Sequence, residues 1–239
     1  MRCNPENNNF PLIGDTAPKF TAQTTNGTVN FPNDYTGHWV VLFSHPMDFT
    51  PVCTTEFLAF QSALPEFKKI NTELIALSVG ALPSHLAWFR SIYTDIKFQN
   101  NKNIKITFPA IADMDLHVSK LYGMIHPNTS DTKTVRAVFI IDPAGIIRTI
   151  LYYPQTTGRN INEILRIVTA LQTTDAFNVS TPADWTPGKP VLESLPQTNT
   201  DMQNRIDKKD KNMQSWYLTF RDLPESKIYD NLTKHNKKH

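Results

Sequence analysis

The chain of 239 residues contains only two cysteines, Cys3 and Cys53, which stand far apart. Two widely separated thiols exclude a disulfide framework, a CxxC redox pair and a zinc site built from cysteines. In a reducing compartment, a lone thiol is either a buried filler or a reactive group. The role of Cys53 is therefore the main functional question.

Long apolar segments and an excess of one charge sign are also missing. No apolar run reaches the roughly 18 residues of a transmembrane helix, and the first ten residues lack the apolar centre of a secretory signal. Lys and Arg together number 24, Asp and Glu 22, and the net charge is +2. We therefore expect a cytoplasmic protein that has neither nucleic acid nor a membrane surface as its partner.

Short apolar runs and helical patterns alternate along the chain, and this alternation predicts an α/β fold. The dipeptide Asn26-Gly27 between two extended runs indicates a hairpin. Leu86, Phe89 and Tyr93 recur at helical spacing. The runs typical of strands buried on both faces are 39–44, 74–79 and 135–141, and 146–153 is expected to return as the next strand after a turn. The helical patterns cover 52–61, 83–96, 115–122 and 160–173. This order predicts a mixed sheet with helices on its faces.

Composition divides the chain into three parts. Residues 1–15 are rich in Asn and Pro, and we expect a flexible N-terminal segment there. Residues 16–173 hold the predicted α/β domain. Residues 174–239 carry many Pro, Lys, Asp and Asn and few apolar runs, which favours a smaller C-terminal domain that packs on something else.

Cys53 lies where a buried strand is predicted to run into a helix. Thr50 is a good N-cap residue and Pro51 suits the first helical position, so Cys53 becomes the third helical residue. The unpaired amides and the dipole at a helix N-terminus favour an anion there. The hydroxyl of Thr50 could accept from the Cys53 amide, or donate to the sulfur or to a substrate. This context leaves burial and reactivity of Cys53 about equally favoured.

A reactive thiol at this position needs a cation nearby. Lowering the pKa of a thiol from about 8.5 to about 6 requires roughly 3.4 kcal/mol of preferential anion stabilisation. A helix terminus supplies about 0.5–2 kcal/mol of this. Arginine is the best source of the rest, because it stays protonated. Arg136 opens an otherwise apolar run and is the candidate, although an exposed arginine at a strand end explains its position equally well.

The segment around Cys53 resembles a known family. Pro46, Thr50 and Cys53 match the PxxxTxxC motif of peroxiredoxins, and the string HPMDFTPVCTTE is similar to the one-cysteine subfamily. The resemblance extends from about Pro11 to Phe220. It implies a thioredoxin-like mixed sheet flanked by helices, with a smaller C-terminal domain. It also implies a thiol-specific peroxidase that reduces hydrogen peroxide and organic hydroperoxides through a cysteine sulfenic acid, with no metal or organic cofactor.

The same resemblance assigns a role to each matching residue. Cys53 corresponds to the peroxidatic nucleophile, the hydroxyl of Thr50 to the group that hydrogen-bonds the peroxide, and Pro46 to the residue that shields the sulfur. Four more positions match supporting residues: the essential arginine (Arg136), the glutamate that orients it (Glu56), a second arginine (Arg159) and the histidine beside the site (His45). His45 also fits a structural histidine at a strand end.

The resemblance further implies how the enzyme is recycled and assembled. Two-cysteine members place a resolving cysteine where this chain has Thr181, so an external thiol of the glutathione or thioredoxin type is expected as reductant. A homodimer contacted by the C-terminal domain is implied, and a higher ring is left open. Met47 stands where a charged residue is common in the subfamily.

Two alternatives remain open at this point. The same scaffold could serve as a redox sensor or a holdase chaperone, with peroxide reduction incidental. A different route to recycling would let Cys3 of one subunit, in place of an external thiol, resolve Cys53 of another.

Overall fold

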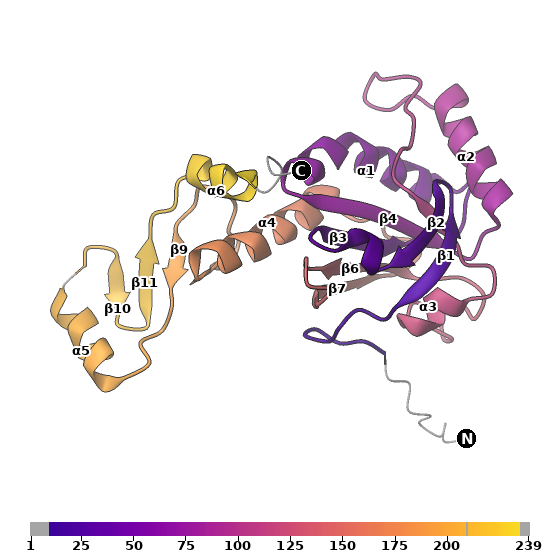
Figure 1. Cartoon of the computed structure of the whole chain (residues 1–239). Helices are drawn as coiled ribbons and strands as arrows, with labels where there is room; N and C mark the ends of the chain where they lie inside the picture. The colour runs from indigo at the N-terminus through magenta and orange to yellow at the C-terminus, as the bar shows by residue number, and fades with distance from the viewer. Residues whose placement is uncertain (1–9, 209, 235–239) are drawn as a thin grey trace. The chain divides into compact units, whose positions relative to one another are not determined.

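A computed structural model describes residues 10–208 and 210–234 of the chain (Figure 1). Cys3 and the tail 235–239 lie outside the described residues, as does most of the segment expected to be flexible. The structure forms two compact units: the first comprises the chain up to Lys68 together with Thr72–Ile161, and the second comprises Lys69–Asn71 together with the chain from Asn162 onward. The boundary expected from composition, after residue 173, falls inside helix α4 (Ile161–Phe177).

A seven-stranded mixed sheet forms the centre of the first unit, in the order β2-β1-β5-β4-β3-β6-β7 (Figure 1). Its strands are β1 (Phe20–Thr24), β2 (Gly27–Phe31), β3 (Trp39–Ser44), β4 (Thr72–Ser78), β5 (Ala110–Ala112), β6 (Arg136–Ile141) and β7 (Ile147–Tyr153). Strand β3 is parallel to β4 and antiparallel to β6. Gly27 has a φ of 107°, which explains the Asn-Gly hairpin between β1 and β2.

Helices cover both faces of this sheet. They are η1 (Asn33–Tyr35), α1 (Pro51–Lys69), α2 (Leu82–Asp95) and α3 (His117–Leu121). Alternate residues of β3 face opposite layers. Leu42 belongs to a buried cluster with Val118 of α3, whereas Phe43 stacks on Phe60 of α1 with ring centroids 4.1 Å apart. The central strand is therefore buried on both faces, as its continuous apolar run predicted.

Two helices differ from their sequence predictions. Helix α1 was expected to end near residue 61 but continues past Pro65 to Lys69. Phe67 in the last turns of this helix is fully buried. The free energy of packing this side chain outweighs the cost of the backbone hydrogen bond that Pro65 cannot donate. In α2 the buried side chains are His85, Trp88 and Ile92, while Leu86 and Tyr93 are exposed. The helix is thus rotated by about one residue from the face that the apolar pattern indicated.

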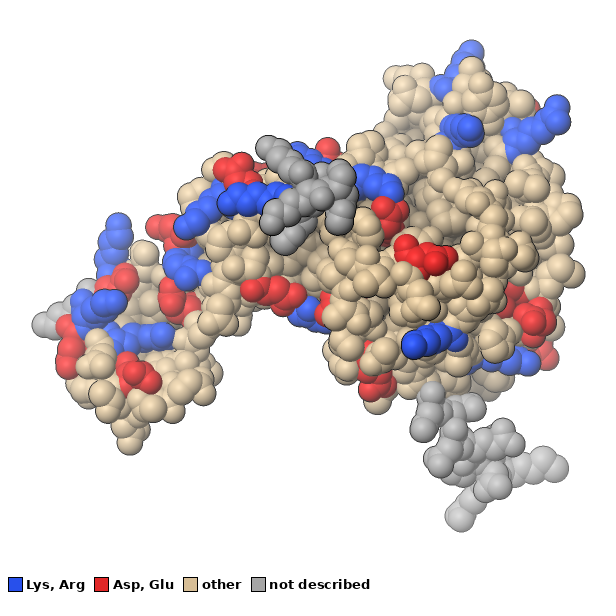
Figure 2. All heavy atoms as spheres, in the orientation of Figure 1, with Lys and Arg blue, Asp and Glu red and all other residues tan. Residues whose placement is uncertain are grey.

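The second unit carries a small four-stranded sheet in the order β10-β11-β9-β8. Besides α4 it contains β8 (Val179–Ser180), β9 (Val191–Glu193), α5 (Asn199–Lys208), β10 (Met213–Ser215), β11 (Leu218–Arg221) and α6 (Glu225–Leu232). Trp185 is fully buried, and its indole nitrogen donates to the carbonyl of Lys189 at 3.0 Å. Basic and acidic side chains are interspersed over the visible face of this unit (Figure 2). No helix among residues 10–208 and 210–234 is long and apolar enough to cross a membrane.

Candidate active site

Cys53 lies in the first turn of α1, immediately after the loop that leaves β3. Pro51 begins the helix, and the amide of Thr54 donates to the carbonyl of Thr50 at 2.9 Å. The first turn of α1 contains no acidic residue that would repel an anion at the sulfur. Cys53 is fully buried and is a free thiol, without a disulfide bond. The sequence therefore placed the thiol correctly at a helix N-terminus.

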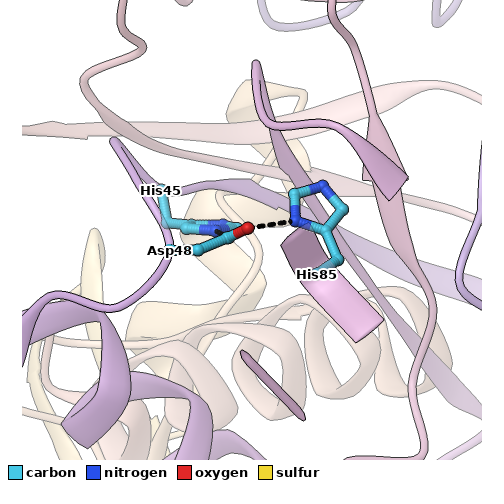
Figure 3. A group of neighbouring side chains, drawn as sticks. All are labelled: His45, Asp48 and His85. Carbon is cyan, nitrogen blue, oxygen red and sulfur yellow. Dashed lines mark hydrogen bonds and ion pairs between the residues drawn. The ribbon is translucent and has the colours of Figure 1, made fainter. Parts of the chain in front are cut away.

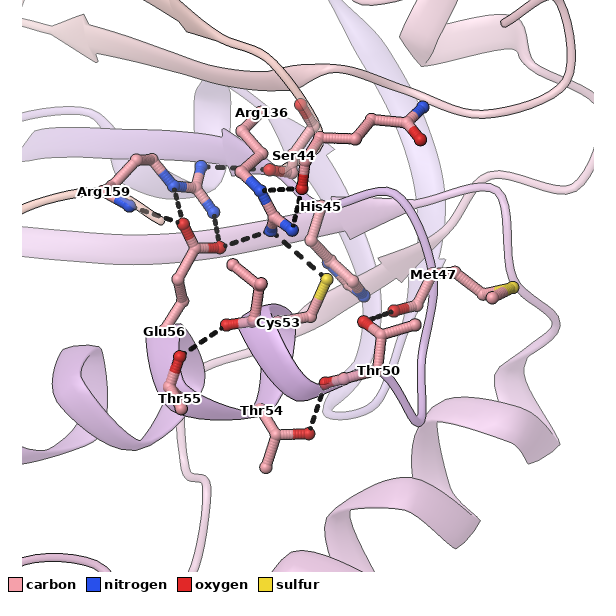
Figure 4. A network of polar contacts seen from close by, with 12 residues as sticks. Ser44, His45, Met47, Thr50, Cys53, Thr54, Thr55, Glu56, Arg136 and Arg159 are labelled. Carbon is pink, nitrogen blue, oxygen red and sulfur yellow. Dashed lines mark hydrogen bonds and ion pairs between the residues drawn. The ribbon is translucent and has the colours of Figure 1, made fainter. Parts of the chain in front are cut away.

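Arg136 reaches this sulfur from the start of β6, although 83 residues separate it from Cys53 (Figure 4). Its Nη1 donates to the Cys53 Sγ at 3.3 Å and to Glu56 Oε2 at 2.8 Å. Its Nε and Nη2 both donate to the backbone carbonyl of Gln155, at 3.0 and 2.6 Å. Two bonds to one carbonyl fix the plane of the guanidinium, so Nη1 remains directed at the thiol. Arg136 is buried and is not the exposed strand-end arginine considered above.

Glu56 and Arg159 form the second half of the network. Arg159 binds both carboxylate oxygens of Glu56, from Nε at 2.9 Å and from Nη2 at 2.6 Å, and its backbone amide adds a third bond at 2.9 Å. Burial alone would raise the pKa of Glu56. The charge and hydrogen bonds of Arg159, together with the charge of Arg136, hold that pKa below its ordinary value. Glu56 is therefore an anion shared by two arginines.

The formal charges of this network do not cancel without the sulfur. Two guanidinium groups face one carboxylate, and all three side chains are buried. An unbalanced buried charge is costly. Cys53 is in contact with Arg136, so its sulfur lies beside a network with one excess positive charge. Such a charge is the nearby cation that a reactive thiol needs.

Pro46 and Thr50 lie in the loop between β3 and α1. Pro46 is buried, and Thr50 is partly exposed. The Thr50 hydroxyl donates to the carbonyl of Met47 at 3.0 Å, rather than pairing with the amide or sulfur of Cys53 (Figure 4). Its oxygen keeps lone pairs that can accept a hydrogen bond. Met47 itself is about half exposed at the outer side of this loop.

His45 follows β3 directly and is fully buried. Its Nε2 lies 3.0 Å from Asp48 Oδ1, and the other oxygen of Asp48 lies 2.7 Å from His85 Nδ1 (Figure 3). Sequence reasoning missed Asp48 and His85. Asp48 could have been identified from the sequence as a candidate site residue, because it is an acidic residue between a buried strand and a helix. His85 lies on the helix face that the apolar pattern did not select.

His45, Asp48 and His85 are also the described His, Cys, Asp or Glu side chains whose spacing suits a metal ion. One ligand atom from each lies within 4.8 Å of the others. In the structure these atoms already bind one another through hydrogen bonds. A metal ion would have to displace both bonds.

These features define a class of protein: a thioredoxin-like α/β fold that carries a buried thiol in contact with an arginine. Residues 13–150 match the AhpC/TSA family, and residues 170–208 match the C-terminal domain of 1-Cys peroxiredoxin. A peroxiredoxin of Methanosarcina mazei is 53% identical over 211 residues, covering 87% of this chain and 96% of that relative. A peroxiredoxin of Aquifex aeolicus is 54% identical over 191 residues, covering 80% and 83%.

Solved structures agree with these matches. A yeast mitochondrial 1-Cys peroxiredoxin superimposes with a TM-score of 0.77 at 41% identity, covering 89% of this chain and 99% of that one. A cysteine-to-serine mutant of peroxiredoxin 6 from Arenicola marina gives 0.76 at 35% identity, covering 90% and 99%. The chain belongs to the peroxiredoxin family, in its one-cysteine branch. It is accordingly a thiol-dependent peroxidase, an oxidoreductase with a peroxide substrate and a thiol reductant.

Proposed function

We propose that Cys53 is the nucleophile that reduces hydrogen peroxide and organic hydroperoxides to water and alcohols. The observation that carries the proposal is the 3.3 Å contact from Arg136 Nη1 to the Cys53 sulfur, within a buried network that is one negative charge short. The thiolate attacks one oxygen of the peroxide, the O–O bond breaks, and Cys53 becomes a sulfenic acid.

The neighbouring residues have distinct roles in this proposal. Arg136 holds the thiolate and stabilises the charge that develops on the leaving oxygen. Glu56 and Arg159 fix Arg136 through the bonds described above. Thr50 binds the peroxide by its hydroxyl, and Pro46 keeps water away from the sulfur. No metal or organic cofactor takes part.

The sulfenic acid is returned to the thiol by an external reductant. Cys53 is the one cysteine among the described residues, and Thr181 stands where a resolving cysteine would be expected. A glutathione or thioredoxin type of thiol is proposed, in line with the yeast relative, whose thiol is resolved through glutathione and thioredoxin systems. We further propose a cytoplasmic homodimer in which residues 174–239 contact the partner; the exposed Trp216 and Tyr217 of that region support this.

The test compares peroxide consumption by the full-length protein and by Cys53→Ser, with glutathione or thioredoxin as the reductant. Many turnovers by the wild type and none by Cys53→Ser are expected. Cys3→Ala is the matched control and should keep its turnover. A wild type that is oxidised once and does not cycle with either reductant would favour the sensor or holdase alternative, and turnover by Cys53→Ser would refute the proposal.

A non-reducing gel after peroxide treatment tests whether Cys3 of one subunit recycles Cys53 of another. A dimer band that disappears in Cys3→Ala would show that Cys3 resolves Cys53 between subunits. Its absence would leave the external thiol as the resolving group.

A further inference from the structure

The last residue of β3, Ser44, lies where this strand parts from β6. The antiparallel register of the two strands ends with Phe43 opposite Val138. The next pair in that register would be Ser44 with Ala137, and both residues are fully buried. Since a buried backbone donor or acceptor needs a partner, the end of this ladder requires hydrogen bonds from other groups.

The side chain of Ser44 supplies two of these bonds. Its hydroxyl donates to the carbonyl of Val135 at 2.6 Å and accepts from the amide of Ala137 at 3.0 Å. A hydroxyl has one hydrogen to give and a carbonyl only accepts, so the direction of both bonds is fixed. Val135 and Ala137 are the two neighbours of Arg136 in the chain. One oxygen atom therefore holds the backbone on both sides of the arginine that contacts Cys53.

Arg159 supplies two further bonds at the same place. Its Nη1 donates to the carbonyl of Ser44 at 3.0 Å (Figure 4) and to the carbonyl of Ala137 at 3.1 Å. The guanidinium thus joins the two strands at the point where they separate. Because Arg159 contacts the main chain of Ser44, a replacement of the Ser44 side chain removes neither bond.

These contacts fix Arg136 at both ends. Its backbone pairs with Tyr153 of β7 on one side, and Ser44 of β3 holds its two neighbours on the other. Its guanidinium is bound to the carbonyl of Gln155. The 3.3 Å contact of Nη1 with the Cys53 sulfur depends on both ends, because a shift of the backbone would move the guanidinium relative to the sulfur.

We propose that Ser44 is a positioning residue for the peroxidase reaction: its hydroxyl fixes the backbone that carries Arg136, and so keeps the guanidinium at the sulfur of Cys53. The inference rests on the proposed function of these two residues. The Ser44 hydroxyl acts through Arg136 and not on the peroxide, because its hydrogen is engaged with Val135. Without the hydroxyl, the carbonyl of Val135 and the amide of Ala137 lose a partner, and the start of β6 is less firmly held.

The test measures how fast iodoacetamide alkylates Cys53 in the full-length Ser44→Ala protein. Both this variant and its reference carry Cys3→Ala, so that Cys53 is the one thiol in the chain. Only the thiolate reacts, so the rate at pH 6 reports how strongly the site favours the anion. We expect that rate to fall roughly 3- to 20-fold, which is part of the effect of removing the guanidinium.

A second pH separates positioning from general loosening. At about pH 9.5 a thiol ionises without a neighbouring cation, so the rates of Ser44→Ala and its reference should converge. An unchanged rate at pH 6 in the folded variant would overturn the proposal. A rate altered by the same factor at both pH values would also overturn it, because it would reflect access to the sulfur instead of the position of Arg136.

Ser78→Ala is the matched control. Ser78 is also fully buried and ends the neighbouring strand β4, but its hydroxyl accepts from the amide of Gly80 at 3.2 Å. This variant should leave the alkylation rate unchanged at both pH values. A fall as large as that of Ser44→Ala would mean that the loss of any buried hydroxyl has this effect, and the proposal would be wrong.

Ser44→Thr and Ser44→Val keep the test decisive if Ser44→Ala does not fold. Threonine and valine have side chains of the same shape and both suit a strand, so their comparison isolates the hydroxyl. Ser44→Thr should stay within about 3-fold of the reference rate at pH 6, whereas Ser44→Val should lose as much as Ser44→Ala. Equal rates in the two folded proteins would contradict a role of the hydroxyl.

A double-mutant cycle tests whether Ser44 acts through Arg136. In Arg136→Met, the further change Ser44→Ala should alter alkylation at pH 6 by less than about 2-fold, because the group that Ser44 positions is gone. An additional fall as large as that in the reference protein would refute the inference.

The rate of Cys53 oxidation by hydrogen peroxide connects the inference to the reaction, and in Ser44→Ala it should fall at least as far as alkylation does. A reference protein in which peroxide leaves Cys53 unoxidised would refute the proposed function. Normal oxidation and normal alkylation in Ser44→Ala, together with slow alkylation in Arg136→Met, would refute this inference alone.

Discussion

Replacing Arg136 with methionine should make Cys53 much less reactive without removing the thiol. Methionine keeps most of the buried stem and removes the guanidinium that contacts the sulfur at 3.3 Å. A charge-assisted hydrogen bond of this kind contributes about 1.5–3 kcal/mol. At 1.36 kcal/mol for each factor of ten, the thiolate population near neutral pH should fall roughly 10- to 150-fold. Glu56 keeps its bonds from Arg159, so its own charge remains paired.

The rate of Cys53 alkylation by iodoacetamide at pH 6 measures this population, because only the thiolate reacts. Arg148→Met is the matched control: Arg148 pairs with Asp142 on the far end of the β6–β7 hairpin, and its loss should leave alkylation unchanged. An Arg136→Met protein that is folded and is alkylated within about 3-fold of the wild-type rate would refute the electrostatic argument.

Three further predictions concern stability. Glu56→Gln leaves two buried arginines without their anion, so the free energy of unfolding in urea should fall by about 3–5 kcal/mol, and a change below about 1 kcal/mol would contradict the network. The pKa values of Glu56 and Asp48 are lower in the folded protein than in the unfolded chain. Their contribution to the free energy of unfolding is therefore complete above about pH 5 and is lost as pH falls below about 4. Urea titrations between pH 7 and pH 3 should show this decline, with a shallower slope in Glu56→Gln. Trp185→Ala should lower the free energy of unfolding of the second unit by about 3–5 kcal/mol, which limited proteolysis would detect as faster cleavage after α4. The control Trp216→Ala changes an exposed side chain and should leave the rate of proteolysis unchanged.

Features that depend on residues adjacent in the chain were predicted from the sequence. Thr50 and Pro51 indicated where α1 begins, and the apolar runs indicated four of the sheet's strands, because capping and burial act on neighbouring residues. Strand β5 was not predicted, since three residues give too short a pattern. The rotation of α2 was not predictable either, because His85 is buried through a partner 37 residues away.

The sequence by itself determined that one thiol stands at a helix N-terminus, because Thr50 and Pro51, which mark the start of that helix, lie beside the cysteine in the chain. Only the tertiary structure decided what surrounds that thiol. Arg136 and Arg159 come from segments that are 83 and 106 residues beyond Cys53, and the pairing of β3 with β6 brings the first of them to the sulfur. Charges and hydrogen-bond partners act through distance in space, so their balance at Cys53 follows from the packed sheet and not from spacing along the chain.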